Sequence, residues 1–332
     1  MPSSAKPLAA LLAKPFPLGY AYDAATLQTL RALLELEDGG SAAATEQTPS
    51  EAELILSGWG VPPLDDAFFR KYPRTRAVFH AAGSIRNFMT DLAWERGVRV
   101  TTAAQINARP VAEFTFAQIL LSLKGAFAQS RACRTQRHFS RQPSPVAGAY
   151  GSTVGLISLG EIGRQVAQRL AALDVRVIAS DPFVHAERAA ALGVQIVTLD
   201  DVFSQSDVVS CHAPLLPSTR GMIRGGHFER MKNGATFINT ARGAVVAETE
   251  MIAVLQRRPA ITALLDVTDP EPPPADSPLF TLPNIFLTPH ISGSLDAECG
   301  RMGRFIADEV RRFLAGEPLQ GEVTRAQAAL LA

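Results

Sequence analysis

Short apolar runs alternate along this chain with longer stretches whose apolar residues recur at helical spacing. In the first third of the chain the runs are ELILSG (53–58), AVFHAA (77–82) and VRVTTA (98–103), and helical stretches such as AATLQTLRALLELE lie between or beside them. Nearer the other end the runs are ATFINTA, ITALLDV and NIFLTPH. Runs without polar alternation are typical of strands buried on both faces of a parallel sheet. The pattern therefore predicts an α/β fold.

One segment, residues 152–183 (STVGLISLGEIGRQVAQRLAALDVRVIASDPF), has the pattern strand, glycine turn, amphipathic helix and second strand. In such a unit Gly160 lets the backbone approach a pyrophosphate, and Gly163 allows the helix to pack tightly on the strand. Asp181 follows Gly160 by about 20 residues, where an acid can accept hydrogen bonds from ribose hydroxyls. The segment therefore predicts a site for NAD.

Ser158 stands where this fingerprint usually has its first glycine. Serine is small, and its hydroxyl can bond a phosphate or cap the turn, so one interpretation is a tolerated substitution. The other is a cofactor site of lower affinity. Binding would persist in either case, because the helix amides around Glu161 and Ile162 would still face the pyrophosphate.

Composition suits two domains better than one hydrophobic core, because the chain has 332 residues, of which 47% are hydrophobic and 19% charged. Basic and acidic residues number 32 each, so we expect no nucleic-acid or anionic-membrane partner. The three cysteines are odd in number and widely spaced, which favours reduced thiols over a disulfide frame. No apolar run is long enough for a signal peptide or a membrane span, and we expect a cytoplasmic protein.

Residues 110–128, PVAEFTFAQILLSLKGAFA, are apolar nearly all round and are expected to form one helix. A helix without a polar face is buried on several sides. It would pack between domains and against a second subunit, which predicts a homodimer. Glu113 and Lys124 argue against a membrane helix.

Three polar residues follow or end the late apolar runs: Arg242 in INTARGAVV, Glu271 in LDVTDPEP and His290 in LTPHISG. Ligands of open α/β sheets collect outside the carboxyl ends of the strands, so we expect these three around one cleft. A guanidinium can hold a carboxylate in bidentate fashion. A histidine paired with a glutamate stays protonated more readily and can pass a proton near neutral pH. The trio indicates reduction of a 2-keto acid.

Taken together, these features resemble the D-isomer-specific 2-hydroxyacid dehydrogenase family, in particular its phosphoglycerate dehydrogenase-like and hydroxypyruvate/glyoxylate reductase-like members. Further matching segments are NARPVAE (107–113), SDVVSCHAPLLPSTRGMI (206–223) and PLFTLPNIFLTPHISG (278–293). The resemblance implies two Rossmann-like domains. A flavodoxin-like substrate domain would comprise residues 1–108 and 292–332, with an NAD-binding Rossmann domain, residues 109–291, inserted in it.

The resemblance also implies a hydride exchanged between C4 of a nicotinamide and C2 of the acid. His290 would give or take the hydroxyl proton, Glu271 would hold that imidazole, and Arg242 would bind the substrate carboxylate and polarise its carbonyl. Thr115 would lie near the nicotinamide, and the alternative is a core helix residue. The full set of expected cofactor positions is Thr115, Ser158, Gly160, Glu161, Ile162, Gly163, Asp181, His212, Ala213, Pro214, Thr219, Thr240, Ala241, Asp266 and Gly293.

The loop HAAGSIRNF (80–88) follows a strand of the first domain, and its amides at Ala82, Gly83 and Ser84 could form a nest for the substrate carboxylate. Arg86 is either a second anion-binding group or a solvated side chain. Trp59 either lines the substrate pocket or covers the core. The histidines lack metal-ligand spacing, so no metal is expected.

Two other functions remain open. One is a formate or phosphite dehydrogenase of the same fold. The formate dehydrogenases of this family carry glutamine where Glu271 stands, so Glu271 argues against a formate dehydrogenase. A binding protein that senses NAD(H), like the corepressors that share this fold, would keep the same three polar residues. Turnover, as opposed to cofactor binding alone, separates this class from an enzyme.

Overall fold

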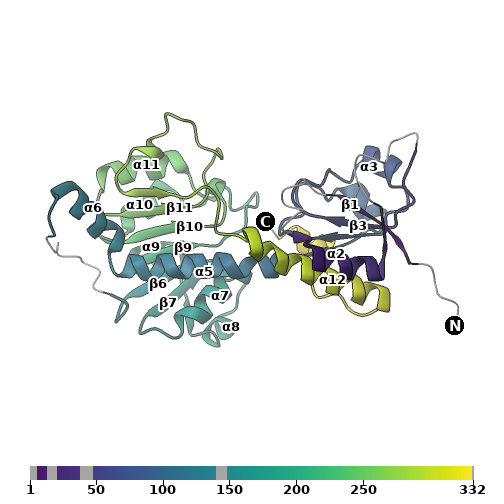
Figure 1. Cartoon of the computed structure of the whole chain (residues 1–332). Coiled ribbons are helices and arrows are strands. Elements are labelled where there is room, and N and C mark those ends of the chain that lie inside the picture. The colour runs from purple at the N-terminus through teal and green to yellow at the C-terminus, as the bar shows by residue number, and fades with distance from the viewer. Residues whose placement is uncertain (1–5, 13–20, 38–47, 140–147, 331–332) are drawn as a thin grey trace. The chain divides into compact units, whose positions relative to one another are not determined.

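The computed structural model describes residues 6–12, 21–37, 48–139 and 148–330. The chain divides into two compact units, one made of Met1–Asn107 with Ser294–Ala332 and the other of Ala108–Gly293. Each unit is built on its own twisted sheet with helices on both faces (Figure 1). The α/β fold class with two Rossmann-like sheets is confirmed.

The first unit has a six-stranded sheet in the order β13-β5-β4-β3-β1-β2, parallel except for β13. Its strands are β1 (Leu8–Leu12), β2 (Glu35–Glu37), β3 (Leu54–Ser57), β4 (Ala77–His80), β5 (Arg99–Thr102) and β13 (Glu322–Val323). Its helices are α2 (Ala24–Leu33), α3 (Asp66–Lys71), α4 (Asp91–Glu95), α12 (Cys299–Ala315) and α13 (Arg325–Ala328), with the 3-10 turn η4 (Asp296–Glu298) before α12. The three early apolar runs are β3, β4 and β5, as predicted.

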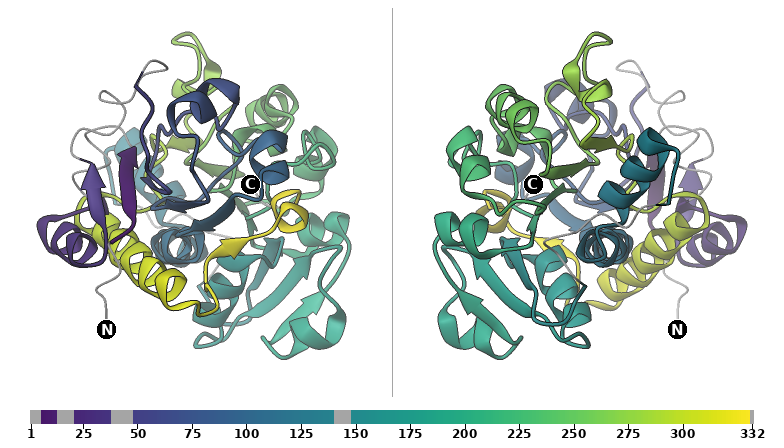
Figure 2. Two further views of the ribbon diagram at one scale, coloured as in Figure 1. Left: turned by 90° about the vertical axis from the view of Figure 1, so that its right-hand side faces the viewer. Right: turned by 90° about the vertical axis from the view of Figure 1, so that its left-hand side faces the viewer.

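Alternating residues of the buried strands feed two hydrophobic clusters, one on each face of this sheet. Leu54 and Leu56 of β3 face α2 and α12, whereas Ile55 faces α3 and α4. Helix α12 lies beside α2 (yellow-green and purple in Figure 2). That packing is close, because a Cβ at Gly303 of α12 would overlap the carbonyl oxygen of Ala21.

The second unit has a seven-stranded, fully parallel sheet in the order β12-β11-β10-β9-β6-β7-β8. Its strands are β6 (Thr153–Ile157), β7 (Arg176–Ser180), β8 (Val194–Ile196), β9 (Val208–Cys211), β10 (Thr236–Asn239), β11 (Thr262–Leu265) and β12 (Ile285–Leu287). Its helices are α5 (Ala104–Leu123, which begins before the boundary), α6 (Ala126–Gln136), α7 (Glu161–Leu170), α8 (Ala186–Ala190), α9 (Leu199–Gln205), α10 (Gly225–Arg230) and α11 (Glu248–Arg257), with 3-10 turns η2 (Gly243–Val245) and η3 (Pro278–Phe280). The strand order reverses between β6 and β9, where such sheets bind ligands.

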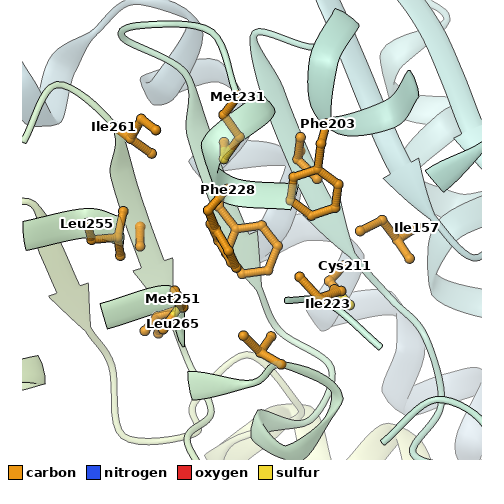
Figure 3. Packing of buried hydrophobic residues seen from close by; sticks show 14 of the residues in the cluster. Ile157, Phe203, Cys211, Ile223, Phe228, Met231, Met251, Leu255, Ile261 and Leu265 are labelled. Carbon is orange, nitrogen blue, oxygen red and sulfur yellow. The ribbon is translucent and has the colours of Figure 1, made fainter. Parts of the chain in front are cut away.

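A hydrophobic cluster that includes three phenylalanines covers one face of the second sheet (Figure 3). Phe228 packs edge-on against Phe203 and Phe237, with ring centroids 5.7 and 5.0 Å away. The opposite face is covered by α5 and α7, whose apolar residues pack on Val154 and Leu156. Rings in these arrangements add to the burial of apolar surface and fix the sheet as a rigid platform.

The expectation of one helix over residues 110–128 is wrong in its extent. Helix α5 ends at Leu123, and α6 begins after Gly125, whose φ of 62° lies in the left-handed region. The two helices meet at a bend of 58°. Among the described residues no single helix is long and apolar enough to cross a membrane. Only the bent pair α5–α6, taken together, has the length and the apolar composition of a membrane span.

The contact at Gly303 makes a prediction for stability. We expect Gly303→Ala to reduce the free energy of unfolding by about 2 to 3 kcal/mol, because a methyl group cannot enter without moving the Ala21 backbone. Gly226→Ala is the matched control, since nothing lies within 4 Å of a Cβ there. Urea unfolding of both variants is the measurement. Equal stability of the two would show that α12 does not pack on Ala21 as described.

Candidate active site

The glycine turn after β6 is closed by hydrogen bonds from the end of the neighbouring strand β7. Asp181 accepts from the backbone amide of Leu159 at 2.7 Å through one carboxylate oxygen and from the amide of Phe183 at 2.8 Å through the other. The Ser158 hydroxyl lies 3.4 Å from the same carboxylate. A carboxylate has about four acceptor positions, so Asp181 retains capacity for further donors.

Ser158 has φ of 75°, which is uncommon for a residue with a side chain. The chain thus keeps the turn conformation that glycine adopts at this place in the fingerprint, at the cost of local strain. The weak hydroxyl contact with Asp181 is the compensation visible in the structure.

Two glycines of the turn have different physical roles. A Cβ at Gly163 would overlap the carbonyl oxygen of Ser158, so glycine is required for helix α7 to approach the strand. A Cβ at Gly160 would meet only the Ser158 hydroxyl at 3.8 Å, so glycine there keeps space open beside the helix N-terminus. The first backbone bond of α7 runs from Arg164 to Gly160, which leaves the amides of Glu161, Ile162 and Gly163 available to an anion. These features fit a dinucleotide pyrophosphate.

His212 follows β9 and is buried beside this turn. Its Nε2 lies 3.1 Å from the Ser210 hydroxyl, and its Nδ1 has no partner within the described part of the chain. Burial lowers the pKa of His212 to about 4, so the ring is neutral near pH 7. Its backbone amide donates to Ile157, which ties the residue to the end of β6.

The loop that continues from His212 is closed on itself. The amide of Leu216 donates to the Thr219 hydroxyl at 2.7 Å, and this hydroxyl donates to the carbonyl of Pro214. Ala213 is buried at the start of the loop. Thr219 thus shapes the loop in which three of the expected cofactor positions lie.

Thr115 of α5 and Thr240 after β10 are brought together by the fold. Their hydroxyl oxygens are 3.1 Å apart, and both side chains are buried. Ala241 follows, and its amide donates to the side-chain oxygen of Asn239 at 3.0 Å. The Asn239 amide group in turn donates to the carbonyl of Arg242 at 3.1 Å. Sequence reasoning missed Asn239, whose signal was only a polar side chain at the end of a buried strand.

Arg242 lies in the turn after β10, partly buried. Its Nη1 donates to the Ala241 carbonyl at 2.6 Å. Burial lowers the pKa of the Arg242 guanidinium, and the Glu271 carboxylate acts in the opposite direction. An arginine stays charged despite such a shift, so the turn holds a fixed cation.

Gly243 brings the arginine loop against the loop after β11. A Cβ at Gly243 would overlap the carbonyl group of Thr268 and lie 2.6 Å from the amide nitrogen of Asp269. Glu248 accepts from that Asp269 amide at 3.1 Å. The loop that leads to Glu271 is therefore positioned by contacts from the segment that follows Arg242.

His290 lies after β12 and contacts Glu271 directly, with Nδ1 and Oε1 2.6 Å apart. The two side chains are 46% and 41% exposed, so the ring is open to a ligand. His290 has φ of 54°, a conformation that costs on the order of 1 to 3 kcal/mol and that clusters at functional sites.

Asp266 holds the strained turn that carries His290. Its buried carboxylate accepts from the Thr288 hydroxyl at 2.6 Å and from the amides of Ile291 and Ser292, both at 2.9 Å. The amide of His290 donates to the Asp266 carbonyl at 3.0 Å. Sequence reasoning assigned Asp266 to the cofactor and missed this contact with the histidine turn. Gly293 follows this turn and is the last residue of the second unit.

Arg242, Glu271 and His290 thus follow β10, β11 and β12, which are adjacent in the sheet. Strand neighbours place a cation, a carboxylate and an imidazole at one sheet edge. Such a set can bind an anionic substrate and move one proton. Across the described residues no group of three or more His, Cys, Asp or Glu side chains could hold a metal ion.

The expected substrate loop belongs to the first unit. Ala82, Gly83 and Ser84 follow β4, and within the described ranges their amides donate to no protein acceptor. Trp59 follows β3 and is 38% exposed. These residues lie at the carboxyl ends of adjacent strands of their own sheet.

A family model described as "D-isomer specific 2-hydroxyacid dehydrogenase, NAD binding domain" matches residues 116–292, just over half of the chain. The chain belongs to this family, and the resemblance read from its motifs is confirmed. The matched region is an NAD-binding domain, with NAD as the cofactor of the family domain.

The chain is 36% identical over 267 residues to D-3-phosphoglycerate dehydrogenase of Mycobacterium bovis, which covers 80% of this chain and 50% of that protein. It thus spans about half the length of the curated relatives that it matches. A phosphoglycerate oxidoreductase from Rhizobium etli is similar in fold, with a TM-score of 0.80, 23% identity and coverage of 97% and 99% of the two chains. A D-isomer specific 2-hydroxyacid dehydrogenase from Xanthobacter autotrophicus, solved with NADPH and MES, has a TM-score of 0.75 at 25% identity, covering 98% of this chain and 100% of that one.

The strain at Ser158 makes a prediction. We expect Ser158→Gly to raise the free energy of unfolding by about 0.5 kcal/mol, because relief of a positive φ outweighs the extra freedom of glycine in the unfolded chain. Ser158→Ala keeps the strain and loses the hydroxyl contact, so it should be less stable than the wild type. Denaturant unfolding ranks the three proteins. If Ser158→Gly proves the least stable, the hydroxyl and not the backbone determines the turn.

Proposed function

We propose that this protein is an NAD-dependent 2-hydroxyacid dehydrogenase that acts mainly as a 2-keto acid reductase. The proposal rests on the 2.6 Å contact between His290 and Glu271. These two residues follow β12 and β11, and Arg242 follows the adjacent strand β10. All three lie in the region that matches the NAD-binding domain. An imidazole paired with a carboxylate is suited to exchange the hydroxyl proton of the acid.

NAD would be held by the glycine turn and α7, with Asp181 accepting from the adenosine ribose, and it supplies the hydride when bound. Thr115, Thr240 and the loop from His212 to Thr219 would complete its site. Because Nδ1 of His290 faces Glu271, Nε2 is the atom left to donate a proton to the substrate oxygen. The Glu271 carboxylate orients the ring through this contact.

Arg242 would pair with the substrate carboxylate and polarise the keto oxygen. Partial burial strengthens this attraction, since less water competes for the guanidinium. The amides of Ala82, Gly83 and Ser84 would bind the same class of anion through backbone donors. The substrate class is therefore a small 2-keto or 2-hydroxy acid.

An NADH-oxidation screen across glyoxylate, hydroxypyruvate, pyruvate, phosphohydroxypyruvate and branched 2-keto acids tests this proposal. We expect turnover with at least one of them, abolished in an Arg242→Ala protein that still binds NADH. Cofactor binding without turnover on any acid would favour the sensing protein instead. Turnover of formate or phosphite alone would favour the other enzyme class.

We also propose that the protein works in the cytoplasm as a homodimer. Three large apolar side chains at or near the α5–α6 region are exposed: Leu121 at 48%, Phe139 at 94% and Tyr150 at 89%. Exposed aromatic residues of this kind are typical of contact surfaces. The three cysteines are free, as in a reducing compartment. Light scattering on the purified chain gives its mass directly.

NAD should be preferred over NADP because of Asp181. Its carboxylate would accept from the ribose hydroxyls and repel a 2′-phosphate. We expect kcat/KM to be at least about tenfold higher with NADH than with NADPH, a difference of about 1.4 kcal/mol. Steady-state kinetics with both cofactors measure it. Asp181→Ala should bring the kcat/KM values for NADH and NADPH closer together, and it should also loosen the turn at Leu159, whose amide donates to Asp181. Equal kcat/KM values for the two cofactors in the wild type would contradict the proposed role of Asp181.

The Glu271 and His290 pair should govern the pH dependence of the reaction. Reduction needs the protonated imidazole, so its rate should fall as pH rises, and oxidation should show the opposite trend. Glu271 holds Nδ1 of the ring at 2.6 Å, so Glu271→Gln should lower kcat in both directions. The NADH dissociation constant, measured by fluorescence, should stay the same. An unchanged kcat would mean that Glu271 does not position His290 for proton transfer.

A further inference from the structure

A cavity of about 460 Å³ in the second unit is lined by the end of α5, the first half of α6 and the loops that lead into β10 and β11. It lies at the amino ends of these two strands, because their first residues, Thr236 and Thr262, line it. Arg242 and Glu271 follow the carboxyl ends of the same strands. The cavity is therefore separate from the candidate active site.

Two buried threonines form part of the cavity wall. Thr236 and Thr262 are paired in register and are 4% and 3% exposed. They lie two residues before Ile238 and Leu264, which pack on the face of the sheet covered by α5, so both threonine side chains point to that face. Neither hydroxyl has a hydrogen-bond partner among the described residues. A buried hydroxyl without a partner is unfavourable, and here a ligand in the cavity can supply one.

Arg131 of α6 adds a cation to the same cavity. Its Nη1 donates to the carbonyl of Pro283 at 3.0 Å, and its Nη2 donates to the carbonyl of Pro259 at 3.3 Å. A guanidinium has five N–H donors, so these two bonds leave capacity for a ligand. Burial lowers the pKa of Arg131, but an arginine remains charged. Within the part of the chain that the structure describes no carboxylate pairs with it, so the two carbonyls fix the cation without neutralising it.

Two further arginines line the cavity. Arg257 pairs with Glu229. Arg258 donates to backbone carbonyls at the end of α10 and to the side chain of Asn233, and it has no carboxylate partner in the described ranges. No acidic residue is among the described residues of the lining, so the cavity has an excess of positive charge.

The first turn of α6 also lines the cavity. Gly125 precedes this helix, and no side chain caps it. The first backbone bond runs from the amide of Gln129 to the carbonyl of Gly125 at 2.9 Å, so the amides of Ala126, Phe127 and Ala128 have no acceptor within the helix. Amides at a helix N-terminus attract anions. They add to the donors that the threonines and the arginine provide.

Apolar residues make up another part of the wall. Phe127 packs on Phe286, with ring centroids 5.1 Å apart, and Ala132, Pro259 and Ala260 line the cavity beside it. Pockets for small ligands have volumes of roughly 300 to 1,000 Å³, so this cavity has room for more than a bare ion. The combination of cations, hydroxyl groups and apolar wall suits an organic anion.

We propose that this cavity is a binding site for a phosphate group carried by a small organic molecule. The Thr236 and Thr262 hydroxyls, the Arg131 guanidinium and the amides of the first α6 turn would bind the phosphate oxygens, and the apolar wall would contact the organic part. These donors outnumber the two oxygens of a carboxylate, which favours a phosphate. Because the cavity lies at the amino ends of the strands, such a ligand would bind together with NAD and the keto acid and would not compete with them.

Three altered proteins test the proposal. The double variant Thr236→Val/Thr262→Val removes both hydroxyls and keeps the shape of the side chains. Arg131→Gln removes the charge. Thr101→Val is the matched control, because Thr101 is also a strand residue whose buried hydroxyl has no partner in the described part of the chain, but it lies in the first unit.

Calorimetric titration of the full chain with phenyl phosphate, in the presence of saturating NADH, measures binding. We expect the wild type to bind this probe and the double variant to raise its Kd at least about tenfold, because both hydroxyls would bond a charged group. Arg131→Gln should also raise the Kd. Thr101→Val and Arg242→Ala should bind the probe as the wild type does. Inorganic phosphate should bind more weakly than phenyl phosphate, because it has no apolar part to bury.

Thermal unfolding gives a second readout. Because the two hydroxyls have no partner in the protein, the double variant without ligand should have a midpoint at least as high as that of the wild type. Phenyl phosphate should raise the midpoint of the wild type and of Thr101→Val, and it should raise that of the double variant less. Hydroxyls with only a structural role would instead give the double variant a lower midpoint in the absence of ligand.

The proposal is wrong if the wild type does not bind phenyl phosphate, or if the double variant binds it with an unchanged Kd. Loss of binding in Arg242→Ala would also overturn it, because the probe would then occupy the candidate active site. Equal Kd values for phenyl phosphate and inorganic phosphate would overturn the organic part of the proposal. Should Arg131→Gln fail to fold, the threonine double variant decides the matter, because it removes no hydrogen bond within the described protein.

Discussion

The buried carboxylate of Asp266 is the constraint on which the site of the second unit depends. It accepts three hydrogen bonds from the turn after β12, and its backbone carbonyl accepts a fourth from His290. Bonds to a buried carboxylate are worth about 1.5 to 3 kcal/mol each, enough to offset the strain of a histidine with positive φ. The imidazole is thereby presented at the sheet edge in the direction of Glu271.

A second constraint acts between loops. Because Gly243 has no side chain, the segment after Arg242 lies against the backbone at Thr268, and the Asp269 amide bonds Glu248. The loops that carry Arg242 and Glu271 are thus held together by the close approach at Gly243 and by the Glu248 side chain, without an ion pair between Arg242 and Glu271. This leaves the guanidinium free to pair with a substrate, which a strong contact with Glu271 would prevent.

Much of the fold could be predicted because the signals are local. Apolar runs without alternation gave the buried strands, and the spacing around Gly160 gave the dinucleotide-binding unit. The break between α5 and α6 was not predictable from composition, since the sequence on both sides of Gly125 is compatible with a helix. The contacts of Asp266 and Asn239 depend on how neighbouring strands are aligned, which no local pattern encodes. His80, at the end of β4, was read only as a histidine without metal-ligand spacing, because the Ser57 hydroxyl that lies 3.0 Å from its Nδ1 belongs to another strand, β3.

The role of His290 as the proton carrier is the central claim, and single-turnover hydride transfer in a His290→Ala protein tests it most directly. The account predicts that oxidation of bound NADH by the 2-keto acid slows by about 10² to 10⁴, because general acid catalysis is lost while the fold and NADH binding remain. The thermal midpoint of the same sample shows how much of it is folded. A transfer rate near that of the wild type in the folded protein would contradict the account and would leave His290 as a residue that only shapes its turn.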